Sequence, residues 1–163
     1  SPRLFVYLDL FSDWKFFRLI TMYKPNRMGF PHGAWINVTE PCLVFSKGKP
    51  KITKKNYVHD CFVYKYDKES HDDSDVGHPT PKPVSMVIEQ LQAVIGNNQI
   101  DLFLGSGSTL IASEKTGRIC YGMELDPKYV DVIVQRYVDY TGNTKIRRNG
   151  EEIIWQKKAD QQK

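Results

Sequence analysis

The feature that most constrains the fold is a short glycine turn between an apolar segment and a helical segment. The apolar segment, residues 99–104, has the length of a buried strand, and Gly105-Ser106-Gly107 follows it directly. A helix is predicted over residues 108–115 and a second strand over residues 119–125. A strand, a tight turn, a helix and a second strand in this order are typical of a parallel sheet covered by helices. The sequence therefore predicts the α/β fold class.

The elements around this unit are also predicted from local patterns. Apolar residues recur at helical spacing from Val84 to Ile95, directly after Pro83, which favours a helix start. Another helix is predicted from Pro127 to about Tyr140, and Asn149-Gly150 between two alternating runs predicts a hairpin. In the first half, runs of β-branched and aromatic residues predict strands over residues 4–10, 19–23, 42–45 and 61–66.

Length and composition limit the class of protein. The 163 residues have the size of one domain, and no apolar run has the length of a membrane helix, so we expect no membrane partner. The net charge of +4 is compatible with a nucleic-acid partner. Cys42, Cys61 and Cys120 are odd in number and form no CxxC pair, which favours a reducing compartment, the cytoplasm.

The glycine turn has an acidic partner in the sequence. Glycines at this position let the backbone approach a ligand, and the following helix start offers N–H groups and a positive dipole end. Glu124 lies at the end of the next predicted strand, 17 residues after Gly107. In a βαβ unit an acidic residue there reaches over the turn and accepts hydrogen bonds from ribose hydroxyls. The pair therefore predicts a cofactor that contains adenosine.

The residues of the turn favour a small nucleoside cofactor. A dinucleotide fingerprint needs glycine or alanine where this chain has Leu110, and the GxxxxGK[ST] phosphate loop is absent. These departures weaken the nicotinamide alternative and favour S-adenosylmethionine (SAM).

Two segments carry a resemblance to a known family. Residues 100–137, IDLFLGSGSTLIASEKTGRICYGMELDPKYVDVIVQRY, resemble the cofactor-binding region of DNA amino-methyltransferases, which methylate adenine N6 or cytosine N4. GHPTPKP, residues 77–83, resembles the HPTxKP motif of the same family. The resemblance is weaker over residues 11–14 and 38–50, which look like the segment between the catalytic and cofactor regions.

The resemblance implies a Rossmann-like SAM-dependent methyltransferase fold and a set of site residues. The residues implied to bind the cofactor are Asp101, Phe103, Gly105, Ser106 and Gly107 along it, Glu124 at its ribose, and His78, Thr80 and Lys82 at its methionine end. The chemistry agrees with this assignment, because a lysine or a threonine hydroxyl on a stiff proline-rich loop can bind the carboxylate of SAM.

The catalytic motif of that family is missing from the sequence. The family positions its target amine with a [DNS]PP[YFW] motif, whereas the nine prolines of this chain include no adjacent pair. The sequence Asp126-Pro127-Lys128-Tyr129 resembles that motif, but it follows the second strand, and we interpret it as a helix start. We assign no catalytic residue. Because the family's motif lies before the segment that begins at Ser1, we expect a fold that is incomplete at its N-terminus and a chain inactive alone.

A basic segment in the first half is the candidate DNA contact. Its lysines, which can neutralise phosphates, are Lys47, Lys49, Lys51, Lys54 and Lys55. A solvated loop remains the alternative. Lys24, Asn26 and Arg27 are further candidates for contacts with base edges.

Aromatic and metal-binding roles have simpler alternatives. We expect Trp14, Tyr23 and Trp35 to lie in the core rather than to stack on a base. The spacing of histidines and cysteines matches no zinc pattern, so we expect no metal.

These observations predict one α/β domain over residues 1–163. Its segments are a partial sheet with a target-recognition-like region at 1–66, an acidic loop at 67–76, the SAM region at 77–142, and a C-terminal hairpin or tail at 143–163. The predicted function is SAM-dependent DNA methylation in a restriction–modification or phage setting. The predicted partners are DNA and either a second copy in a homodimer or a missing catalytic segment. The alternatives are a non-catalytic module that binds SAM or DNA, and an NAD-dependent oxidoreductase.

Overall fold

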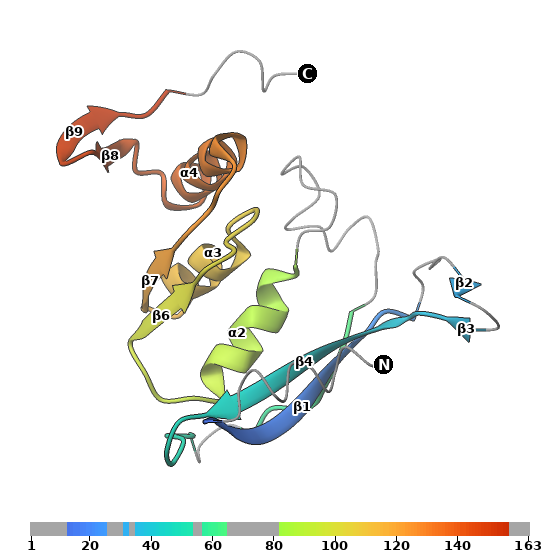
Figure 1. Ribbon diagram of the computed structural model, residues 1–163. Coiled ribbons are helices and arrows are strands. Elements are labelled where there is room, and N and C mark those ends of the chain that lie inside the picture. Colours follow the sequence, from blue (N-terminus) through green and yellow to red (C-terminus); the bar gives the residue numbers. More distant parts are fainter. Residues whose placement is uncertain (1–12, 26–30, 33–34, 54–56, 65–81, 157–163) are drawn as a thin grey trace. The chain divides into compact units, whose positions relative to one another are not determined.

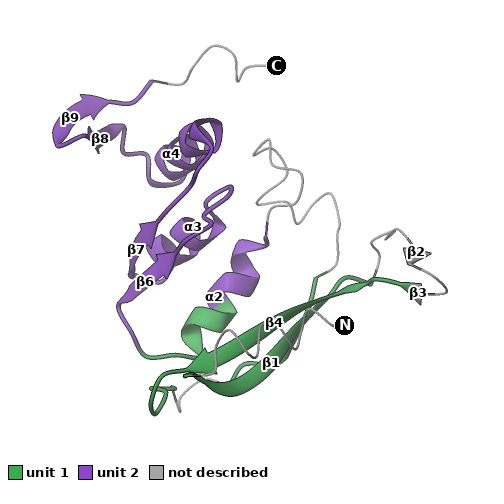
Figure 2. Ribbon diagram, in the orientation of Figure 1, with its two compact units in different colours: residues 1–71, 89–95 green, residues 72–88, 96–163 purple. Residues whose placement is uncertain are grey.

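The computed structural model describes residues 13–25, 31–32, 35–53, 57–64 and 82–156 (Figure 1). It contains two compact units (Figure 2): unit 1 comprises residues 1–71 and 89–95, and unit 2 comprises residues 72–88 and 96–163. Helix α2, Val84–Gln92, contributes residues to both units. Among the described residues, no helix has both the length and the apolar character needed to cross a membrane.

Unit 1 is built on a three-stranded sheet. Strand β1, Lys15–Tyr23, pairs antiparallel with β4, Thr39–Ser46, and parallel with β5, Cys61–Val63. The short strands β2, Pro31–His32, and β3, Trp35–Ile36, pair with each other. The strands predicted over residues 19–23 and 42–45 are confirmed within longer strands. The strand predicted from residue 61 is confirmed as far as Val63, whereas residues 4–10 and the acidic loop lie outside the described residues.

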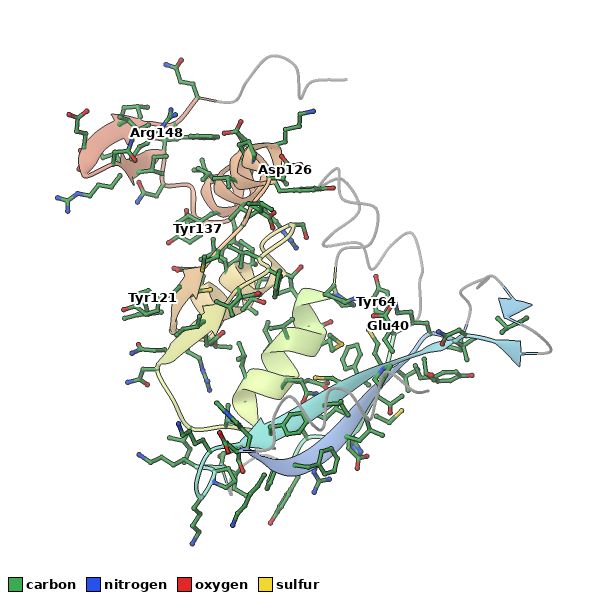
Figure 3. The ribbon with its side chains drawn as sticks, viewed as in Figure 1. Glu40, Tyr64, Tyr121, Asp126, Tyr137 and Arg148 are labelled. Carbon is green, nitrogen blue, oxygen red and sulfur yellow. The ribbon has the colours of Figure 1, made fainter. Side chains whose placement is uncertain are left out.

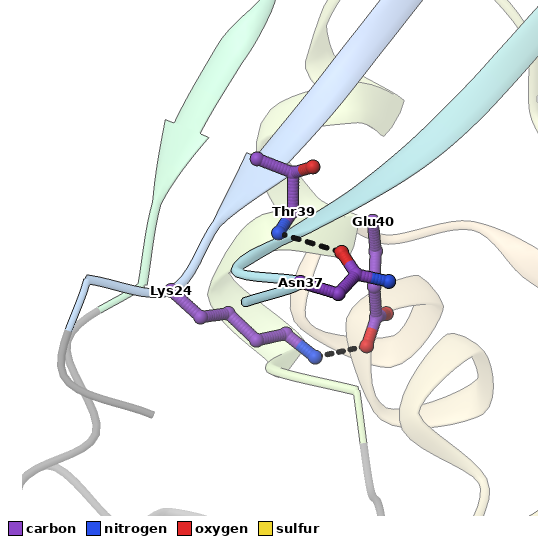
Figure 4. A network of polar contacts seen from close by, with 4 residues as sticks. All are labelled: Lys24, Asn37, Thr39 and Glu40. Carbon is purple, nitrogen blue, oxygen red and sulfur yellow. Dashed lines mark hydrogen bonds and ion pairs between the residues drawn. The ribbon is translucent and has the colours of Figure 1, made fainter. Parts of the chain in front are cut away.

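A part-buried ion pair joins Lys24, just after β1, to Glu40 at the start of β4. Lys24 is only 7% exposed, and its Nζ contacts a carboxylate oxygen of Glu40 (Figure 4). The adjacent turn is fixed by Asn37, whose Oδ1 accepts a hydrogen bond from the Thr39 N–H at 3.3 Å. The hypothesis that Lys24 contacts base edges is therefore wrong for this structure, because its ammonium group is buried against a carboxylate. Asn26 and Arg27 lie outside the described residues.

The aromatic side chains of unit 1 are more exposed than predicted. Trp14 is 43% exposed and Tyr23 is 38% exposed, so their assignment to the core is wrong. The Lys47 Nζ lies 6.0 Å from the centre of the Trp14 ring, which suits a weak cation–π contact. The side chain of Trp35 lies outside the described part of the chain.

Unit 2 contains the predicted parallel strands. Strand β6, Asn98–Asp101, pairs in parallel with β7, Ile119–Gly122, and α3, Ser108–Lys115, connects them. Gln99 and Cys120 are register partners on the face toward α3, where the Ser113 hydroxyl lies 2.9 Å from the Gln99 Oε1. Buried Ile111 and Ala112 provide the apolar contacts of α3.

The opposite face of this strand pair is exposed. Ile100 is 74% exposed and its register partner Tyr121 is 57% exposed, and Figure 3 shows Tyr121 projecting outward from β7. The prediction that residues 99–104 form a buried strand is therefore wrong as to burial. Both strands also end earlier than predicted, at Asp101 and Gly122.

The remaining elements of unit 2 begin and end at recognisable signals. Helix α4, Pro127–Thr141, has Asp126 as its N-cap, and the Asp126 Oδ1 accepts a hydrogen bond from the Lys128 N–H at 2.9 Å. This geometry agrees with the interpretation of residues 126–129 as a helix start. Strands β8, Lys145–Arg148, and β9, Glu151–Ile154, form the predicted hairpin, with positive φ at both Asn149 and Gly150.

Candidate functional site

The glycine turn lies at the carboxyl end of β6 and leads directly into α3. The Leu104 N–H donates to the Met123 carbonyl at 2.9 Å, and the Gly107 N–H donates to the Leu104 carbonyl at 2.8 Å. Gly105 and Gly107 have φ values of 57° and 84°, which glycine adopts without the steric cost that other residues pay. Gly107 is also the N-cap of α3, and no side chain caps this helix start. The turn thus presents a helix N-terminus at the sheet edge.

Glu124 lies against this turn. Its Oε2 accepts a hydrogen bond from the Gly105 N–H at 2.8 Å, and its Oε1 accepts one from the Asp126 N–H at 3.0 Å. The carboxylate is therefore held by two backbone groups, one in the turn and one at the start of α4. The sequence predicted that Glu124 reaches the turn, and the structure brings the two together; the role at a ribose stays a prediction.

Asp101 and Phe103 lie just before the turn. The Asp101 Oδ1 accepts a hydrogen bond from the Phe103 N–H at 3.0 Å, so this carboxylate shapes the end of β6. Phe103 is 89% exposed, and Leu125, next to Glu124, is 97% exposed. Sequence reasoning did not select Leu125, because a single leucine after a strand has no pattern that separates a binding role from packing.

A second group of contacts joins the turn to α4 and to Lys82. The Arg136 Nη1 donates to the Ser106 carbonyl at 3.1 Å and lies 3.2 Å from the Ser108 Oγ. The Ser108 hydroxyl in turn donates to the Lys82 carbonyl at 2.7 Å. Ser106 and Ser108 are both buried. Sequence reasoning missed Arg136 and Ser108, because an arginine in an amphipathic helix has the pattern of a solvated residue.

The other predicted residues are distributed as follows. Lys82 is exposed, and its backbone is joined to the start of α3, whereas His78 and Thr80 lie outside the described residues. Lys47, Lys49 and Lys51 are exposed in unit 1. Lys54 and Lys55 fall outside the part of the chain that the structure describes.

The described residues include no group of three histidine, cysteine or acidic side chains placed to hold a metal ion. Cys120 lies on the α3 side of β7, and burial, the largest effect, raises the pKa of its thiol. A thiol with a raised pKa is a poor nucleophile at neutral pH, which suits a packing role.

Comparisons with known proteins identify the family. The N6_N4_Mtase family of DNA methylases matches residues 2–135, and the chain belongs to this family. YubD of Escherichia coli (strain K12), whose name describes it as a methylase, is 32% identical over 99 residues, which are 59% of this chain and 40% of YubD. The chain thus matches less than half the length of this relative.

Solved structures agree with the family assignment. The M1.HpyAVI–SAM complex is 25% identical with a TM-score of 0.64, over 84% of this chain and 71% of that chain. The cytosine-N4-specific PvuII DNA methyltransferase has a TM-score of 0.66 at 16% identity, over 85% of this chain and 57% of that chain. These likenesses confirm the predicted α/β methyltransferase fold.

Proposed function

We propose that unit 2 binds SAM at the turn formed by residues 105–107. The observation that carries the proposal is the contact between the Gly105 N–H and the Glu124 carboxylate, which places an acidic side chain beside an uncapped helix start. In this proposal Glu124 accepts hydrogen bonds from the ribose hydroxyls. The related M1.HpyAVI was solved with SAM, which supports the same cofactor here.

The proposal also assigns roles to the other predicted residues and to Leu125. Asp101, Ser106 and Gly107 shape the turn, and the exposed side chains of Phe103 and Leu125 offer apolar surface to the adenine. Lys82, with His78 and Thr80, binds the methionine end, where an ammonium group can pair with the carboxylate. The proposal assigns no role to a metal ion.

We further propose that the reaction is methylation of an exocyclic amine of adenine or cytosine in DNA. When bound, SAM supplies a methyl group on a positively charged sulfur. The protein's contribution is then alignment of the amine with that methyl group, in a pocket that receives a base turned out of the duplex. The 163-residue sequence has no [DNS]PP[YFW] motif to hold the amine, so we expect no transfer by this chain alone.

Exposed lysines of unit 1 are the proposed DNA contact. Lys47, Lys49 and Lys51 are exposed, and the same segment includes Lys54 and Lys55. Each phosphate contact releases counterions, so the affinity for DNA falls steeply as salt rises. A DNA partner favours the cytoplasm as location. A separate segment with the catalytic motif would complete the enzyme. A homodimer and the single-domain organisation over residues 1–163 stay predictions.

The test compares ligands and variants of the whole chain. SAM at about one hundred times its dissociation constant should stabilise the chain by roughly 2.7 kcal/mol, and NAD should stabilise it less. Glu124→Gln should weaken SAM binding about tenfold or more, because hydrogen bonds to a charged group contribute about 1.5–3 kcal/mol. Glu151→Gln, a matched change in β9, should leave SAM binding unaltered.

Two results would contradict the proposal. Absence of SAM binding by calorimetry, or equal binding by Glu124→Gln, would remove the assigned site. Transfer of tritiated methyl groups to DNA by this chain alone would refute the expectation that it is inactive, while leaving the SAM site in place.

A further inference from the structure

Arg136 makes an unusual contact at the start of α3. Its guanidinium lies beside the first turn of that helix, with Nη1 at 3.1 Å from the Ser106 carbonyl and 3.2 Å from the Ser108 Oγ. A cation at a helix N-terminus is electrostatically unfavourable, because this end of the helix carries partial positive charge. The hydrogen bonds to Ser106 and Ser108 must therefore offset that repulsion.

Ser108 links α4 to the segment at Lys82, as the direction of its hydrogen bonds shows. A serine hydroxyl has one hydrogen to donate and can accept bonds from other donors. The Ser108 hydroxyl donates to the Lys82 carbonyl at 2.7 Å, so its oxygen is the acceptor for Arg136. Because Ser108 is 6% exposed, water competes little for these bonds.

The same face of α4 supports the turn through an apolar contact. Ile133 lies one helical turn before Arg136 and is 6% exposed. Its Cγ1 and Cγ2 are so close to Gly107 that a Cβ added at Gly107 would lie 3.3 Å from each. Helix α4 thus contacts the glycine turn at two points, one apolar and one charged.

We propose that Arg136 is a positioning residue, which fixes the position of the glycine turn relative to Lys82. The inference rests on the proposed function, in which the turn receives the adenosyl part of SAM and Lys82 its methionine part. Arg136 touches neither part in this arrangement. It acts on the adenosyl side through Ser106 and on the methionine side through Ser108.

The arrangement favours arginine over lysine. Nη1 of a guanidinium carries two hydrogens in fixed directions, and its two nearest acceptors are Ser106 O and Ser108 Oγ, with Ser106 Oγ farther away at 3.5 Å. Lysine has a flexible stem and a single nitrogen at its end, so Arg136→Lys should restore the charge but only part of the alignment.

The experiment measures two ligands that differ at one end. S-adenosylhomocysteine carries the amino-acid part, whereas 5′-methylthioadenosine lacks it. Arg136→Gln should raise the Kd of S-adenosylhomocysteine about tenfold, the equivalent of about 1.4 kcal/mol, and that of 5′-methylthioadenosine by no more than about threefold. Arg136→Lys should give an intermediate ratio. Arg147→Gln, the same change on exposed β8, should leave both values unaltered.

A second variant tests the same link without changing the charge. Ser108→Ala should shift the ratio of the two Kd values in the same direction, and combining it with Arg136→Gln should add little, because both changes break one connection. If Arg136→Gln fails to fold, Ser108→Ala still decides the matter. Equal weakening of both ligands in Ser108→Ala would indicate a general loss of structure and overturn the inference. Lack of binding by the unaltered chain would overturn the proposed function as well.

Discussion

Replacing Gly107 by alanine tests whether the glycine turn is shaped by α4 or only by its own backbone. Gly107 has a φ of 84°, in the left-handed region, and an added Cβ would lie 3.3 Å from Cγ1 and Cγ2 of Ile133. Ile133 is 6% exposed, so its side chain has little room to move. The substitution therefore has two separate energetic costs, one from backbone strain and one from packing against Ile133.

Each of these two costs has a typical magnitude. An L-residue in the left-handed region costs about 1–2 kcal/mol, and overpacking a core costs about 1–3 kcal/mol. Because the overlap at Ile133 is only a few tenths of an ångström, the lower end of the packing cost applies. Alanine also lowers the conformational entropy of the unfolded chain, which stabilises the folded state by about 0.4–1 kcal/mol and offsets part of these costs. The net loss in the free energy of unfolding should be about 1–3 kcal/mol.

Gly117 offers a matched control. It has a φ of 65°, and an added Cβ there would meet nothing within 4 Å. Gly117→Ala therefore carries the backbone cost alone, and the difference between the two variants in urea denaturation measures the contact with Ile133. We expect Gly107→Ala to be the more destabilised by about 1 kcal/mol, the lower end of the overpacking cost. Equal losses in the two variants would refute the reasoning that α4 shapes the turn.

Three further predictions test other parts of the structure. Glu40→Gln should lower the free energy of unfolding by about 1–3 kcal/mol, because it weakens the partner of the buried Lys24 ammonium, and Lys24→Met should cost less in the same urea titration. Asp126→Ala removes the N-cap of α4 and should cost about 1 kcal/mol, measured by thermal unfolding; an unchanged Tm would contradict the cap. Cys42 is exposed by surface area, yet partial desolvation raises the pKa of its thiol, so its alkylation by iodoacetamide near neutral pH should be slower than in the urea-unfolded chain. The unfolded chain loses this proton first as pH rises, so the same shift lowers the free energy of unfolding at alkaline pH, and equal alkylation rates in the two states would exclude it.

The parts of unit 2 that could be predicted are those with local signals. Asp126 followed by Pro127 predicts the start of α4, and Asn149-Gly150 predicts the hairpin, because each pair fixes the backbone within a few residues. The ends of elements depend on partners elsewhere. The apolar periodicity extends to Ile95, yet α2 ends at Gln92 because the following residues pair with residues 51–53, where the Ile95 N–H donates to the Lys51 carbonyl at 2.9 Å.

Burial was harder to predict than the order of elements. Parallel strands are usually covered on both faces, and a short apolar run such as residues 99–104 is therefore expected to be buried. In this structure α3 covers the face with Gln99 and Cys120, whereas Ile100 and Tyr121 on the other face are exposed. A pattern of apolar residues records which side chains prefer to leave water, but it does not say which element covers them.

In the candidate site, too, residues identified by local spacing could be predicted, whereas residues whose partners are distant in the sequence could not. Glu124 was predictable because the spacing of a βαβ unit places it beside the turn. Arg136 was not, since its partners Ser106 and Ser108 lie 30 and 28 residues earlier in the sequence. Arg147 belongs to the same residue type and lies exposed in a strand. The two arginines differ because α4 packs against the glycine turn and places Arg136 beside Ser106 and Ser108. Their roles can therefore be distinguished only by a measurement that depends on this packing, such as the ratio of the affinities for S-adenosylhomocysteine and 5′-methylthioadenosine.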